Sequence, residues 1–332
     1  MKKYLLPNEG RFFKANLHCH TTMSDGEMTP AEMKEAYKAQ GYSIIAYTDH
    51  ELMFLQNHLQ DDDFLPLNGL EFAVDQKAPL DKTGKKVHMS AIAMEPDNIY
   101  TPCFNENIFM GGNLRKNIPL MTPDPKTIGY ERKYSPDGIN EMISIFKDAG
   151  FFLTYNHPNW SLEYPEDYSK YTGFDAIEIY NHGTVMIGHN GYSPEAHETF
   201  LRKGEPVYCL ATDDNHNHAH NPDDSFGGFV MIKAEKLEYR TIMKALKDGN
   251  FYASQGPQIT ELWMEDGKVH IECSDAERII LRTKYRRGKT LGGINGNPIT
   301  AADFDVFPED VYFHITVTDR YGKHAHTQAY FL

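Results

Sequence analysis

Histidine and carboxylate residues recur in this chain at spacings that suit metal binding. Sixteen histidines are present, and 12 of them precede residue 221. His18 and His20 are two residues apart in an apolar run, so on a β-strand both imidazoles would leave the same face. Asp25 follows in the sequence Thr-Met-Ser-Asp-Gly, a turn that can return its carboxylate to the strand end. Two imidazoles and a carboxylate on one side are suitable ligands for a divalent ion.

Histidine, aspartate or glutamate also stands at the end of most other apolar runs. In one run, a histidine stands near the start instead. Burying several such groups together without a compensating cation costs several kcal/mol each. A cluster of divalent ions removes that cost, and mixed nitrogen and oxygen ligands favour zinc, manganese or iron over calcium or magnesium. The residues concerned are Asp49, His50, Glu71, His88, His157, Asp213, Asp214 and His216.

Seven apolar runs supply the strands that must position these groups. Their Ile, Val, Leu, Phe and Tyr content is typical of strands buried on both faces of a parallel sheet. They cover residues 12–20, 42–50, 64–72, 87–94, 151–158, 174–182 and 205–216.

Helices are predicted between several of these strands. Thr29 as a cap, Pro30 at the first position and Glu32 at the third begin a helix that ends near Gly41. Three further helices are predicted over residues 135–150, 193–204 and 236–249. The alternation indicates right-handed βαβ units in a doubly wound sheet or a closed barrel. Chemistry at the carboxyl ends of seven strands favours an α/β fold of the TIM-like barrel type over residues 1–256.

The pattern changes after the Gly256-Pro257 junction. Short alternating segments separated by Gly, Asn and Asp predict a small antiparallel, β-sandwich-like domain over residues 257–332. We expect it to have a structural role, because its sequence shows no aromatic cluster or basic stripe. Residues 95–134, rich in Asn, Pro, Gly and Met, are interpreted as a long insertion that could act as a lid.

Composition excludes several classes of protein. Of the 332 residues, 40% are hydrophobic and 24% charged, which is typical of a folded globular chain. The formal net charge of −14 disfavours general nucleic-acid binding. Four cysteines without a CxxC pair favour unpaired thiols in a reducing compartment. Without a signal-peptide run or about 18 consecutive apolar residues, we expect a cytoplasmic protein with no membrane contact.

The motifs NLHCHT, SDG, YTDH, GLE, VH, NHP and DxH, in this order, resemble those of the polymerase and histidinol phosphatase (PHP) family of metal-dependent phosphoesterases. The resemblance covers about residues 12–256, and the trailing β domain is similar to that of two-domain PHP-like proteins. It implies a distorted seven-stranded β/α barrel with two or three divalent ions at its carboxyl end.

The resemblance also implies three ligand sets, with Glu71 shared by two of them. Asp25 stands where many family members have a histidine, so the third ion can differ in identity or occupancy. The Asp213-Asp214 doublet leaves one choice open, and Asp214 has the Asp-x-His spacing with His216. The first set is His18, His20, Glu71 and Asp214; the second is Glu71, His88 and His157; the third is Asp25, His50 and His216.

Such a centre predicts hydrolysis without a side-chain nucleophile. Paired metal ions can hold a hydroxide and bind phosphoryl oxygens. We expect a phosphoesterase acting on a small phosphorylated metabolite or nucleotide. One alternative is a carboxylic or carbamate ester hydrolase on the same scaffold. Another is a vestigial barrel with a structural or regulatory role, which the full set of competent ligands disfavours.

Further side chains are candidates for catalysis or substrate contact. Asp49 can orient His50 or an adjacent ligand, or can simply be a turn carboxylate. His182, at the end of the sixth run, can face the substrate or solvent. Arg115 and Lys116 in the insertion can clamp a phosphate or remain solvated loop charges.

Two points about the surroundings of the site stay open in the sequence. His218 and His220 extend the last ligand loop, where they can contact substrate or lie on an exposed polar loop. Association into a homo-oligomer is also compatible with the sequence.

Overall fold

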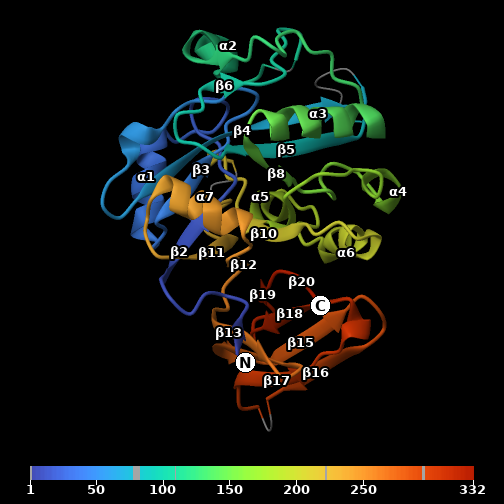
Figure 1. Ribbon diagram of the computed structural model, residues 1–332. Coiled ribbons are helices and arrows are strands. Elements are labelled where there is room, and N and C mark those ends of the chain that lie inside the picture. Colours follow the sequence, from blue (N-terminus) through green and yellow to red (C-terminus); the bar gives the residue numbers. More distant parts are fainter. Residues whose placement is uncertain (1, 78–82, 109, 221–222, 294–295) are drawn as a thin grey trace.

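The computed structural model describes residues 2–77, 83–108, 110–220, 223–293 and 296–332. All seven predicted strands of the first part are confirmed (Figure 1). Except in β4 and β5, the predicted ligands lie just beyond the strand ends, in loops. The strands are β2 (Arg11–Asn16), β3 (Ile44–Tyr47), β4 (Leu65–Asp75), β5 (Lys86–Ala93), β8 (Phe151–Tyr155), β9 (Ala176–Asn181) and β10 (Tyr208–Thr212).

The four predicted helices are also confirmed. Before the first of them, the Thr29 side chain accepts from the Glu32 amide and the Glu32 carboxylate accepts from the Thr29 amide, which completes the predicted capping box. The four are α1 (Pro30–Ala39), α3 (Pro136–Asp148), α6 (Pro194–Lys203) and α7 (Tyr239–Lys247). Shorter helices are α2 (Leu114–Asn117), α4 (Pro165–Tyr168), α5 (His182–Met186) and the 3₁₀ turns η1 (Asn57–Leu59), η2 (Ile118–Leu120) and η3 (Pro308–Asp310).

Strand β5 runs opposite to its neighbours. It pairs antiparallel with both β4 and β8, whereas β3 is parallel to β2 and β4, and β9 is parallel to β8 and β10. The expectation of uninterrupted parallel βαβ units is therefore wrong at this strand. The link from β4 to β5 is residues 76–85, shorter than the dozen or more that a parallel crossover needs. As a result, the first residues of β5 lie at the edge where the neighbouring strands end.

The sheet continues past β2 into strands that the sequence pattern of seven runs did not include. β11 (Phe229–Ala234) pairs antiparallel with β2, and β12 (Phe251–Ser254) with β11. Among the described residues no ladder joins β10 to β2 or β11, so strand pairing gives an open mixed sheet, not a closed barrel. One parallel bridge, Cys19 to Asn215, connects the segments that follow β2 and β10.

The C-terminal part is antiparallel, as predicted, and forms two sheets. Residues of both sheets, including Leu262, Phe304, Leu281 and Ile315, share one buried apolar cluster. One sheet has the order β1 (Lys3–Tyr4), β13 (Ile259–Glu265), β14 (Lys268–Ala276) and β17 (Ile299–Asp305). The other continues from β12 through β19 (His324–His326), β18 (Tyr312–Thr318), β15 (Arg278–Thr283) and β16 (Gly288–Gly292), with β20 (Tyr330–Phe331) beside β18.

The two parts of the chain are connected by strand pairing. β12 bonds to β19, and the N-terminal β1 bonds to β13 (Figure 1). The predicted division at Gly256-Pro257 stays a prediction. In the part of the chain that the structure describes, no helix has both the length and the apolar character needed to cross a membrane.

The insertion of residues 95–134 packs on the turn that carries Asp25. It contains α2, η2 and the short strands β6 (Tyr100–Thr101) and β7 (Thr122–Pro123). The Asn113 amide donates to the Ser24 carbonyl at 2.6 Å, and the Asn117 side chain donates to the Met23 carbonyl at 2.8 Å. The insertion therefore supports this turn, and its role as a lid stays a prediction.

Candidate metal centre

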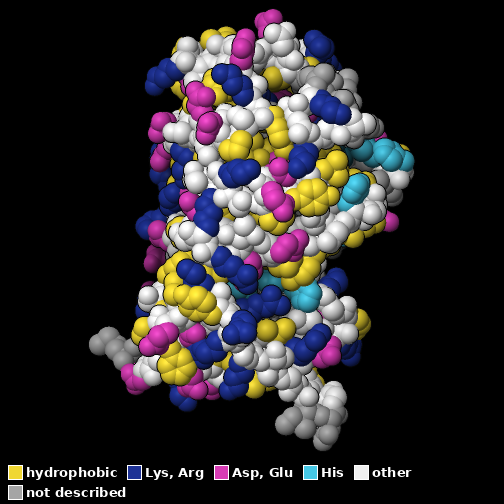
Figure 2. Space-filling model, turned by 90° about the vertical axis from the view of Figure 1, so that its right-hand side faces the viewer, with side chains coloured by type: hydrophobic (Ala, Val, Ile, Leu, Met, Phe, Trp, Pro, Cys, Tyr) yellow, Lys and Arg dark blue, Asp and Glu magenta, His cyan; other side chains and the backbone are white. Residues whose placement is uncertain are grey.

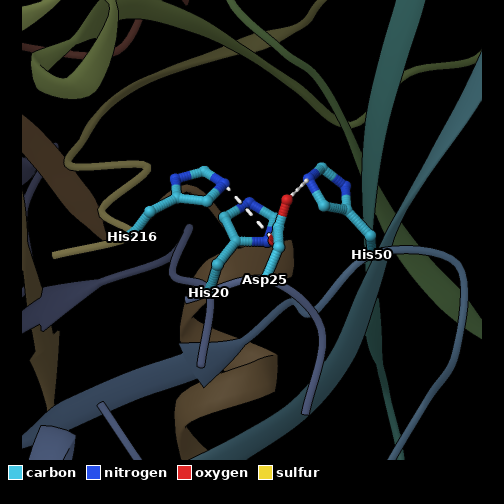
Figure 3. Close-up of side chains that lie close together, drawn as sticks. All are labelled: His20, Asp25, His50 and His216. Atoms are coloured by element: carbon cyan, nitrogen blue, oxygen red, sulfur yellow. Dashed lines mark ion pairs between the residues drawn. The ribbon is translucent and has the colours of Figure 1, made fainter. Parts of the chain in front are cut away.

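All nine predicted ligands come together at one edge of the sheet. Nitrogen and oxygen atoms of eight of them form three overlapping groups compact enough to hold a metal ion, and the ninth, His88, has Nδ1 3.0 Å from Glu71 Oε1. Figure 3 shows one of these groups, in which imidazoles from three separate loops surround the Asp25 carboxylate. The groups are His20, Asp25, His50 and His216; His18, Glu71 and His157; and His18, His20 and Asp214.

Glu71 lies at the middle of the cluster and is almost fully buried, with 1% of its surface exposed. Its Oε1 lies 3.0 Å from His88 Nδ1, 3.2 Å from His157 Nε2 and 3.3 Å from His18 Nε2. Its Oε2 lies 3.0 Å from His50 Nδ1. Each carboxylate oxygen thus faces a different set of imidazoles, which is the geometry expected of a bridging ligand.

His88 reaches this centre because of the direction of β5. It lies near the first residue of β5, whereas the other strands contribute side chains at or beyond their last residues. Because β5 pairs antiparallel with β4 and β8, its first residues lie at the edge where those strands and their neighbours place the other ligands.

The arrangement of donors and acceptors fits a group of cations. His18 Nδ1 lies 2.7 Å from Glu178 Oε1, and a proton on that nitrogen leaves Nε2 as an acceptor. His18 Nε2 then faces two further ligand atoms, His20 Nε2 at 3.1 Å and Asp214 Oδ1 at 3.2 Å. The buried atoms His20 Nδ1, His88 Nε2 and Asp25 Oδ1 have no hydrogen-bond partner among the described residues. Divalent ions would satisfy such crowded acceptors.

Protons can neutralise the same carboxylates when metal does not. Burial disfavours the cationic form of His50, but the carboxylates of Asp25 and Glu71 outweigh it and raise its pKa to about 10. The pKa of His18 is likewise raised well above its usual value, because nearby carboxylates outweigh the effect of burial. His20 differs, since burial and the neighbouring imidazoles of His216 and His50 lower its pKa to about 3.

The geometry favours Asp214 over Asp213 as the ligand. The Asp213 carboxylate accepts hydrogen bonds from the Tyr37 hydroxyl at 2.7 Å and the Gly228 amide at 2.8 Å, so it holds a neighbouring loop. Asp214 instead directs Oδ1 toward His18 and His20. Its backbone has φ 54°, a left-handed conformation that a residue other than glycine keeps only when its surroundings impose it.

Glu178 positions two of the ligands, and the sequence analysis did not identify it. Besides His18, its carboxylate accepts from the His157 amide at 2.9 Å and the Thr212 hydroxyl at 2.6 Å. Carboxylates in this position fix the ring orientation and raise the basicity of a metal-binding histidine. The signal was a charged residue inside the buried apolar strand β9, where an unpaired carboxylate would be costly.

The predicted catalytic residues lie outside the ligand cluster. Asp49 accepts hydrogen bonds from the amides and hydroxyls of Thr21 and Ser24, so it shapes the turn that leads to Asp25. His182 bonds to the Tyr180 hydroxyl at 2.9 Å and to the Asp223 carbonyl at 3.0 Å. A role for either residue in catalysis stays a prediction.

The predicted phosphate clamp also lies away from the centre. Arg115 and Lys116 are exposed on α2 and are not among the described residues that line the cavity beside the cluster. The insertion faces the Asp25 turn with Asn113 and Asn117 instead, so the two cations lie on its solvent side. Their contact with a substrate stays a prediction.

A cavity of about 640 Å³ opens directly beside the cluster. Trp160 forms part of its wall, with its ring 5.0 Å from the rings of both His88 and His157. Leu162 and Ile187, both largely exposed, add further apolar surface. The polar lining includes Lys86, His189 and the two loop histidines predicted from sequence, His218 and His220.

The family model of the PHP domain matches residues 16–192, more than half of the chain. The chain belongs to the PHP domain family. Every strand-end motif up to the NHP sequence lies within the matched segment, whereas Asp214 and His216 lie beyond it. No curated protein matches the chain.

The solved structures that are similar to this PHP protein include the following two. A two-domain protein from Bacteroides vulgatus, described as containing a predicted PHP-like metal-dependent phosphoesterase, is 17% identical with a TM-score of 0.43; the match covers 99% of this chain and 98% of that one. An amidohydrolase from Chromobacterium violaceum, with bound sulfate and no metal, is 16% identical with a TM-score of 0.37; the match covers 62% and 89%.

Replacement of the central carboxylate tests the bridging geometry. We expect Glu71→Gln to lose more than one metal equivalent per chain, because each oxygen of Glu71 faces a different set of imidazoles. We expect His88→Ala to lose at most one. Elemental analysis after dialysis against a weak chelator measures both, and equal metal loss in the two variants would contradict a bridging role.

Glu178 should control metal affinity without touching the metal. We expect Glu178→Gln to weaken metal binding by about 10- to 100-fold, because the amide removes the negative charge beside His18 Nδ1 and puts an NH2 donor in place of one of the two acceptor oxygens. Glu163→Gln is the matched control, since Glu163 is also buried and accepts from three tyrosine hydroxyls away from the cluster. Competition with a metallochromic chelator measures the affinities, and similar losses in both variants would indicate a general effect of folding.

Metal binding should release protons at pH 7. The pKa of His50 is raised to about 10, so this imidazole is protonated at pH 7 before metal binds, whereas a bound imidazole must be neutral. Metal affinity should therefore fall as pH falls. Calorimetric titration of the metal-stripped protein in two buffers of different ionisation enthalpy measures the release, and a heat independent of the buffer would refute the expectation.

Proposed function

We propose that this PHP protein is a metal-dependent phosphoesterase that hydrolyses a small phosphorylated molecule. The observation that carries the proposal is the convergence of imidazoles and carboxylates around Glu71, with buried ligand atoms that lack protein partners. Two or three ions of zinc, manganese or iron suit the mixed nitrogen and oxygen ligands. When bound, they would supply an activated water and neutralise charge on phosphoryl oxygens.

The residues of the chain would keep this centre rigid during the reaction. Glu178 orients His18, and Asn156 donates to Glu71 Oε1 at 2.8 Å, which fixes the central carboxylate. Asp49 and the insertion hold the Asp25 turn from two sides. A preorganised site of this kind lowers the reorganisation needed when charge develops on the substrate.

The cavity indicates how a substrate would be held. Lys86 lines it and could attract a phosphoryl group, although its ammonium also lies 3.0 Å from Asp75. Trp160 and Ile187 provide an apolar surface for the remainder of the substrate. We therefore assign phosphate attraction to Lys86 in preference to Arg115 and Lys116.

We also propose that the strands of the first part of the chain are arranged as a distorted barrel. The Cys19 to Asn215 bridge and the hydrogen bond from the Asp214 amide to the His18 carbonyl at 3.0 Å support closure between the segments after β2 and β10. In this view residues 1–256 form the catalytic unit, and residues 257–332 form a second unit attached through β12 and β1.

A substrate panel tests the function. We expect release of phosphate from phosphomonoesters, or cleavage of phosphodiesters, that is lost with chelator and restored by manganese or zinc. Glu71→Gln should lower the rate at least about 100-fold, because it disturbs the shared ligand. Colorimetric phosphate and phenol assays measure the rates.

The same panel separates the alternatives. Aryl and carbamate esters are included, and metal-dependent cleavage of these alone would favour the ester hydrolase. Metal binding without turnover of any compound would favour a structural or regulatory barrel.

Trp160 should determine preference for aromatic substrates. We expect Trp160→Ala to raise KM about fivefold for naphthyl phosphate, because the naphthyl ring would lose an aromatic partner worth about 1 kcal/mol. KM for glycerol phosphate should change less than about twofold. Trp263→Ala is the control, since Trp263 stacks on His270 in the C-terminal part. Both variants should keep their metal content. An equal change in KM for the two substrates would contradict the proposed contact of Trp160 with the aromatic group.

A further inference from the structure

A positively charged groove lies between α6 and the hairpin of β15 and β16, apart from the metal centre. Its volume is about 380 Å³, and its lining includes Arg202 of α6, Tyr285 of the turn and several basic residues of the hairpin. Figure 2 shows Lys and Arg side chains gathered in the lower half of the face that it draws. None of the residues that line it belongs to the metal cluster.

The strand pattern explains how these charges reach one place. On β15, Arg278, Ile280 and Arg282 alternate with buried residues, so both arginines leave the same face of the sheet. Arg286 in the turn and Lys289 on β16 are exposed beside them. The expectation that this part of the sequence has no basic stripe is therefore wrong, because five of the eight residues 282–289 are Lys or Arg.

Most of the groove's positive charge is uncompensated. Glu198, the acidic residue of the lining, lies 2.6 Å from His314 Nε2 and 3.3 Å from Arg202 Nε. By contrast, Arg282, Arg286 and Lys289 form no ion pair with any residue that the structure describes. Three unpaired cations in one groove are unusual in a chain whose formal net charge is −14.

We propose that this groove binds a small polyphosphorylated ligand of nucleotide size. Guanidinium groups bind phosphate oxygens through paired hydrogen bonds, and several of them together suit a chain of phosphates. Tyr285 is 60% exposed and lines the same groove, so its ring is accessible to a base.

The size and charge of the surroundings favour a small ligand over a nucleic acid. The groove lies within the volume range of small-molecule sites, about 300–1,000 Å³, and α6 bounds one side. A long polyanion would have to continue across a chain with 47 acidic and 33 basic residues, and that surface would repel it.

The proposal is tested by calorimetric titration at 0.15 M salt. The ligand is an ATP analogue with a methylene bridge between its β and γ phosphorus atoms. The bridge prevents hydrolysis at that position. We expect one site per chain, and a Kd at least about tenfold weaker in the triple variant Arg282→Gln, Arg286→Gln and Lys289→Gln. Binding to the control Lys236→Gln, Lys244→Gln and Lys268→Gln should stay within about twofold, because these lysines are exposed and do not line the groove.

Further measurements keep the result specific to the groove. Inorganic tripolyphosphate should displace the analogue. If the triple variant fails to fold, Arg286→Gln alone replaces it in the test, because Arg286 is an exposed turn residue, and we expect this variant to bind the analogue more weakly. Absence of binding, or equal weakening in both triple variants, would overturn the proposal. Loss of binding in Glu71→Gln but not in the groove variant would place the ligand at the metal centre. Tighter binding of single-stranded DNA than of the analogue would show a nucleic-acid surface instead.

Discussion

The structure depends on concentrating carboxylates and imidazoles at one edge of the sheet, some of them fully buried and others beside an open cavity. Glu71 and His18 are buried among groups that cannot all satisfy one another by hydrogen bonding, so the centre needs cations, either metal ions or protons. That requirement explains the strained backbone at Asp214 and the buried carboxylate of Glu178, which would each be costly in an ordinary core. The surrounding elements serve to hold these groups at one edge of the sheet.

Two features of the chain have opposite electrostatic character. The metal centre gathers negative charge from several loops and can accept positive ions. The groove beside α6 gathers positive charge on the C-terminal sheet and can accept an anion. Strand pairing through β12 and β19 connects the two parts within one hydrogen-bonded sheet. The described linings of the two sites have no residue in common, so the binding proposed for the groove and the chemistry proposed for the metal centre can be studied with separate sets of variants.

Much of the first part was predictable because local rules decide it. Apolar runs bounded by polar turns became β2 to β5 and β8 to β10, and the Thr29 to Glu32 capping box formed as expected. The convergence of these side chains was predictable because imidazoles and carboxylates at almost every strand end are hard to explain by packing alone. Arg115 and Lys116 illustrate the limit, since a basic residue in a loop shows nothing about the direction in which the loop faces.

The sequence by itself determined which residue types are available for metal chemistry, where strands and helices occur, and that an antiparallel part follows. Only the tertiary structure decided the reversed direction of β5, the support of the Asp25 turn by residues 95–134, and the contact of Glu178 with His18. These depend on which strands become neighbours, and that choice is made by packing and hydrogen bonding between segments far apart in the chain. The pattern of residues within a single segment does not determine which strands become its neighbours.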